Sequence, residues 1–94
     1  MIPRATAAPV IRALLHDKLQ YLDSDSRGYQ WLRTIESQAG MCLEGFSESY
    51  KAAEAIYYSL EMMRGEVERD EGLVSVGEAI KAGTAVMQIL TVCL

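Results

Sequence analysis

Apolar residues along the middle of the chain recur alternately every three and every four positions. Eleven positions follow this spacing, and ten of them are apolar, the exception being Ser49: Leu32, Ile35, Ala39, Cys42, Phe46, Ser49, Ala53, Ile56, Leu60, Met63 and Val67. Such a seam places apolar side chains on one face of a helix, and its length exceeds the three to four repeats that indicate a coiled coil. The pattern therefore predicts one long central helix over residues 26–69.

Three glycines interrupt the seam and leave an alternative open. Gly40, Gly45 and Gly65 each destabilise a helix interior by about 1 kcal/mol relative to Ala. The sequence Gly45-Phe46-Ser47 is typical of a helix end that is followed by a new N-cap. A break would be expected to shift the seam out of phase, and the seam stays in phase. We therefore favour the long helix, with a kink allowed between Gly40 and Gly45; the alternative is a four-helix bundle with a break at Gly45.

A shorter helix is predicted on each side of the central one. Apolar residues share one broad face over residues 9–22, and Pro9 suits the first turn of that helix. Residues 1–8 are expected to be disordered or extended. Asp70-Glu71-Gly72 is a turn signal, after which the last helix is predicted over residues 73–92. The second half of this last helix is apolar nearly all round, which predicts burial on all sides. With no strand pattern, the fold class is all-α.

The length of the chain favours assembly with a second copy. The sequence has 94 residues, of which half are hydrophobic, and we expect it to form a single helical domain over residues 1–94. A continuous central helix would be about 65 Å long, so the two shorter helices would leave each half of it incompletely covered. We therefore predict an antiparallel homodimer that shares its core between chains through Phe46, Ile56, Leu60, Met63, Val86 and Leu90.

A second group of apolar residues lies beside the seam rather than on it. Tyr58 and Met62 are one helical turn apart, Ala55 lies next to them, and Trp31 borders the seam. Tyrosine and methionine are common at protein contact surfaces because they offer a large, adaptable area. We predict that these four residues bind a partner. The alternatives are that the first or last helix covers Tyr58 and Met62, and that Trp31 packs in the core. Met41 stands alone on the polar side and predicts nothing by itself.

The charge of the chain bears on its partners and its location. The formal net charge is −4, and the nine basic residues are scattered singly. This disfavours nucleic acid and suits a protein partner with a basic surface. The low cysteine count and the absence of a recognisable signal peptide favour the cytoplasm. The most apolar stretch, residues 84–94, is about half of the roughly 20 residues that span a membrane, so no membrane association is expected.

Few residues suggest chemistry. His16 is the single histidine, and with Cys42 and Cys93 it makes at most three candidate ligands, whereas structural zinc takes four. No phosphate-binding or catalytic motif is present in the sequence. We expect no catalytic, cofactor-binding or metal-binding residue and no enzyme activity. Glu36 is the one acid that we would test, and we expect it to pair with Arg33 or Arg12.

The sequence therefore predicts a small acidic interaction protein. This class includes adaptors, secretion chaperones, inhibitors, antitoxins and immunity proteins, of the small kind that bacteria and phages encode. The alternative is a transcriptional regulator that binds nucleic acid through a helix-turn-helix near Gly45. Its recognition helix would begin near Ser47, with Lys51 as the one basic residue for three turns, which is poor material for a phosphate-binding surface.

Overall fold

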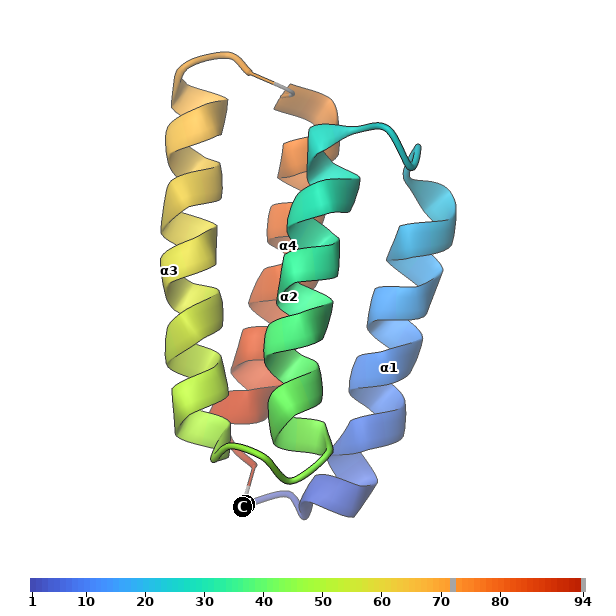
Figure 1. The fold of residues 1–94 in the computed structure, drawn as a ribbon, viewed down its shortest axis with the longest axis vertical. Helices are drawn as coiled ribbons and strands as arrows, with labels where there is room; N and C mark the ends of the chain where they lie inside the picture. Colours follow the sequence, from blue (N-terminus) through green and yellow to red (C-terminus); the bar gives the residue numbers. More distant parts are fainter. Residues whose placement is uncertain (72, 94) are drawn as a thin grey trace.

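The computed structural model describes residues 1–71 and 73–93. Within these ranges the chain forms four helices, α1 (Arg4–Tyr21), α2 (Arg27–Leu43), α3 (Ser49–Glu68) and α4 (Leu73–Thr91). Successive helices run in opposite directions along one long axis (Figure 1). The predicted all-helical bundle is confirmed.

The middle of the chain is two helices, so the prediction of one long helix over residues 26–69 is wrong. α2 ends at Leu43 and the chain reverses before α3 begins. Gly45 lies in this turn with a φ of 86°, in the left-handed region that glycine adopts without a steric penalty. The amides of Phe46 and Ser47 both donate to the Met41 carbonyl, at 2.8 and 3.1 Å, and so satisfy an acceptor at the end of α2.

Both halves of the seam face one core, although the chain reverses between them. The core includes seven seam residues, four from α2 and three from α3: Leu32, Ile35, Ala39, Cys42, Ile56, Leu60 and Met63. Two antiparallel helices that pack on the same neighbour each need an apolar face, and a continuous helix needs the same spacing. The phase of the seam therefore did not distinguish a long helix from a folded pair.

α4, together with α2, lies at the centre of the bundle. It contacts α1, α2 and α3, whereas α1 and α3 lie on opposite sides and make no contact in the described chain (Figure 1). Its residues Val76, Val86 and Leu90 are fully buried. Burial on all sides, however, does not extend through its second half, because Ala85, Met87 and Ile89 are only half-buried, and Val92 just after the helix is exposed. By length and composition α4 is also apolar enough to cross a membrane, a test that the core helix of a bundle passes equally.

The first helix begins earlier than predicted. α1 starts at Arg4, so the segment expected to be disordered or extended is helical from that residue, and Ala7 is buried in the core. Pro9 lies inside α1. Its missing N–H removes the donor that would otherwise bond to the carbonyl of Ala5 four residues earlier.

The last helix, in contrast, lies close to its predicted range of 73–92. In the turn predicted before it, Asp70 has a φ of 64° and α3 ends just upstream, while Gly72 lies outside the described residues.

The residues predicted for a core shared between chains are mostly buried within one chain. Five of the six have no exposed surface, namely Ile56, Leu60, Met63, Val86 and Leu90. Phe46, the sixth, lies in the turn and is 73% exposed, because the reversal at Gly45 removes it from the seam. The shared core was predicted from uncovered halves of a long helix, and α2 and α3 instead cover one another. The homodimer itself stays a prediction.

Candidate protein-binding surface

Exposed large apolar side chains gather on α3 and around the turn that precedes it. Six of the twelve in the described chain lie there, and we call this set the α3 face: Met41, Phe46, Tyr50, Tyr57, Tyr58 and Met62. The set holds four of the seven aromatic residues of the chain. A concentration of exposed apolar side chains on one side of a small protein indicates an interaction site.

The position of α3 at the edge of the bundle explains this exposure. The opposite side of α3 packs on the core through Ile56, Leu60 and Met63, so residues half a helical turn away face solvent. α1 lies on the far side of the bundle and cannot cover them (Figure 1). The rings of Tyr57 and Tyr58 meet edge to face, with centroids 5.6 Å apart and planes at 72°, which holds the two side chains together.

The structure places three of the four predicted partner-binding residues on this side of α3. Tyr58 and Met62 are 61% and 62% exposed, and Ala55 is half-buried beside them. Neither α1 nor α4 covers Tyr58 or Met62, which was the alternative considered for them. Trp31 lies apart, half-buried on α2, where its indole N–H donates to Glu66 at 2.7 Å.

Trp31 belongs to a network that joins α2 to α3. Arg27 donates to the Glu66 carboxylate from Nε at 3.2 Å and from Nη2 at 2.5 Å, and its guanidinium lies 5.8 Å from the centre of the Trp31 ring. The hydrogen bond from Arg27 lowers the pKa of Glu66 and outweighs burial, which acts in the opposite direction; the Trp31 hydrogen bond lowers it further. These contacts assign Trp31 a role in packing rather than an open binding surface.

The negative charge of the protein is concentrated on the same part of the chain as the α3 face. Residues 44–71 hold eight acidic and three basic residues, whereas the rest of the chain holds five acidic and six basic ones. Glu44, Glu48 and Glu54 are exposed and have no ionic partner among the described residues, while Glu61 pairs with Arg64 at 2.6 Å. The exposed apolar side chains are therefore surrounded by uncompensated carboxylates.

The sequence reasoning missed Met41, Tyr50 and Tyr57. The turn after α2 brings Met41 to the edge of α3, where it lines a groove of about 240 Å³ with residues of both helices. Only the reversal of the chain creates that neighbourhood. Tyr50 and Tyr57, in contrast, are seven residues apart and off the seam, so their spacing did contain a signal of a shared helix face.

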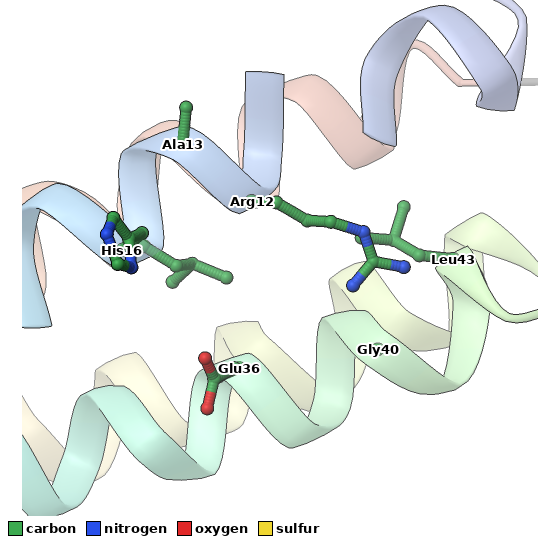
Figure 2. A pocket seen from close by; sticks show the side chains of 7 residues that line it. Arg12, Ala13, His16, Glu36, Gly40 and Leu43 are labelled. Atoms are coloured by element: carbon green, nitrogen blue, oxygen red, sulfur yellow. The ribbon is translucent and has the colours of Figure 1, made fainter. Parts of the chain in front are cut away.

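A second hollow lies between α1 and α2. It has a volume of about 450 Å³, and Arg12 and His16 line it from α1 while Glu36 lines it from α2. The Arg12 guanidinium extends toward Leu43 rather than toward Glu36 (Figure 2). Glu36 forms an ion pair with Arg33 at 3.1 Å, one of the two partners expected for it. Since its charge is already compensated, this acid offers less to a ligand than the open carboxylates near α3 do.

No three His, Cys, Asp or Glu side chains in the described part of the chain lie close enough to hold a metal ion. Comparison of the chain with known protein families, with curated proteins and with solved structures found no match.

Proposed function

We propose that this chain is a small protein-binding module whose α3 face docks on a partner with a basic surface. The observation that carries the proposal is the coincidence of two properties on one side of the bundle. The exposed tyrosines and methionines offer contact area, and the uncompensated glutamates around them attract positive charge. An adaptor, a chaperone, an inhibitor and an antitoxin would all use such a surface.

The energetics of this surface favour a partner. Full burial of a large apolar side chain such as methionine is worth about 1.5–3 kcal/mol before the costs of association are subtracted, so Tyr58 and Met62, 61% and 62% exposed, can contribute part of this to a complex. Tyrosine in particular is enriched among the few residues that dominate binding at protein interfaces. The acidic surroundings accelerate association with a basic partner and disfavour acidic ones.

The nucleic-acid alternative is supported less well. In a helix-turn-helix the two helices meet at about 90–120°, whereas α2 and α3 lie antiparallel side by side (Figure 1). The helix that would enter the DNA groove is α3, which belongs to the acidic part of the chain. Phosphate groups are repelled by such a helix.

Quantitative co-purification tests the proposal. We would compare the tagged wild-type protein with the double variant Tyr58→Ser/Met62→Ser in native host cells, at low and at high salt. We expect a basic partner that the wild-type protein retains, that high salt weakens, and that the variant retains about tenfold less, which corresponds to roughly 1.4 kcal/mol.

The matched control replaces exposed valines outside the α3 face, in the variant Val10→Ser/Val74→Ser. This control should retain the partner as the wild-type protein does, and circular dichroism should show equal helix content in all three proteins. A partner that survives the α3-face substitutions and is lost in the control would place the binding surface elsewhere and overturn the proposal.

A further inference from the structure

The groove between α2 and α3 has a largely apolar lining. Its walls come from α2, from the turn and from α3: Gln38, Met41, Ser47, Lys51, Ala52 and Ala55. The small side chains of Ala52 and Ala55 leave space for an incoming group. Gln38 and Ser59 exchange hydrogen bonds of 3.0 and 3.2 Å between the two helices, so each has a partner within the protein.

One stripe of α3 continues the groove along the helix. Lys51, Ala55, Tyr58 and Met62 follow at intervals of four, three and four residues, which places them on one side of α3. At 1.5 Å per residue this stripe is about 16 Å long, or three helical turns. It provides an apolar track for an elongated ligand rather than a closed pocket for a small one.

Within the bundle, α1 is an example of a helix that packs against two others. α1 packs against both α2 and α4 on one side of the molecule, while no helix of the described chain lies over α2 and α3 on the other side (Figure 1). A helix placed there would make the same kind of two-helix contact that α1 makes. Amphipathic helices bind in apolar grooves through side chains at positions i, i+3, i+4 and i+7.

The charges around the groove specify the polar side of the ligand. Glu44 and Glu48 lie at the turn end, and Glu54 is exposed on α3 next to the stripe. Glu61 is also exposed there, but it is paired with Arg64. Lys51 is the one basic side chain that lines the groove in the described chain. On this basis, and resting on the protein-binding function proposed above, we propose that the groove between α2 and α3 binds an amphipathic helix whose apolar stripe is flanked by basic residues.

Fluorescence anisotropy with two labelled peptides tests this proposal. Both designed 18-residue helices would carry the same leucine and alanine stripe, flanked by lysines in one peptide and by glutamates in the other. We expect the wild-type protein to bind the lysine-flanked peptide at least about tenfold more tightly at low salt, and added salt to reduce that difference.

Protein variants then locate the site. Ala55→Trp fills the groove and should weaken binding of the lysine-flanked peptide about tenfold or more, whereas Ala5→Trp, at an exposed alanine on α1, should leave it unchanged. Met41→Ser on the opposite wall is a second variant that removes contact area without adding bulk. Circular dichroism should show that each variant remains helical.

The outcomes separate this inference from the protein-binding function. The proposal that the groove binds a helix would be overturned by any one of three results. These are equal affinity for the two peptides, no binding of either peptide, and binding that both Ala55→Trp and Met41→Ser leave intact. If the double variant Tyr58→Ser/Met62→Ser still loses its host partner in that case, the protein-binding function stands and only the helix inference fails. In the opposite case, the groove variants weaken peptide binding, but Tyr58→Ser/Met62→Ser still retains the host partner. That result would support the helix inference and reject the α3 face as the host partner's site.

Discussion

Glu66 lies near four other acidic residues around the end of α3, and it differs from them in being only 6% exposed. A buried carboxylate is costly unless hydrogen bonds compensate it, and Arg27 and Trp31 supply those bonds from α2. Both donors are more than thirty residues away in the sequence. Nothing in the local pattern around Glu66 therefore distinguishes it from its solvated neighbours.

For the single residue Glu66 we predict that its contribution to the free energy of unfolding is lost in acid. The folded chain holds the pKa of Glu66 below its ordinary value of 4.5, mainly through Arg27. Its stabilising effect is therefore complete above about pH 4.5 and is lost as the pH falls through the lowered value. We expect Glu66→Gln to be less stable than the wild-type protein by about 1–3 kcal/mol at pH 7, and the difference to shrink below pH 4.5.

Urea unfolding, followed by the fluorescence of Trp31, measures this difference at each pH. Because Lys18 also lowers the pKa of Glu78 in both proteins, comparison with Glu66→Gln isolates the contribution of Glu66. A difference in unfolding free energy that stays constant from pH 7 to pH 3 would refute the assignment.

The packing of α2 on α4 depends on a close approach at Gly28. The amide of Gly28 donates to Ser75 Oγ at 3.0 Å, and a Cβ at this position would overlap the backbone of Ser75. At Gly77 in α4, by contrast, a Cβ would meet no atom within 4 Å. The two glycines look alike in the sequence, and only the distance to the neighbouring helix separates their roles.

Alanine substitutions at these glycines should have opposite effects. Gly28→Ala must push α2 away from α4, and we expect it to destabilise the protein by about 1–3 kcal/mol. Gly77→Ala removes a flexible residue from a helix interior and should stabilise it by up to about 1 kcal/mol. Thermal or urea unfolding measures the change in stability of each variant. Equal effects of both substitutions would show that α2 and α4 do not approach closely at Gly28.

The whole molecule buries its own core. Its extents are 38 × 23 × 19 Å, and the bridge between Ile2 and Cys93 brings both ends of the described chain together at one end of the bundle. The five buried residues that the sequence assigned to a core shared between chains need no second copy to cover them. A homodimer, if the protein forms one, has the exposed α3 face available for its contacts.

We therefore expect the midpoint of urea unfolding to stay constant over roughly a hundredfold range of protein concentration. A core shared between chains would make the midpoint rise with concentration, because association would then be part of folding. Light scattering under the same conditions gives the mass, which is 10.4 kDa for one chain. A doubled mass with a constant midpoint would indicate dimers joined by surface contacts, whereas a rising midpoint would restore the shared core.

The sequence by itself determined the features that depend on local spacing. Helical periodicity is a property of neighbouring residues, so it predicted the all-helical class and the burial of Leu32, Ile35 and Leu60. The local turn signal at residues 70–72 predicted where α4 begins. It also indicated that Tyr58 and Met62 lie off the core face, and both are exposed.

Only the tertiary structure decided whether the chain reverses at Gly45 and which residues that reversal brings together. A straight helix and a folded pair satisfy the same spacing, and the choice between them depends on whether α2 and α3 can cover one another and pack on α4. The turn at Gly45 exposes Phe46 and places Met41 against α3. The contact of Arg27 with Glu66 joins residues that are distant in the sequence, and it arises from this packing. The local pattern of apolar and polar residues therefore does not predict it.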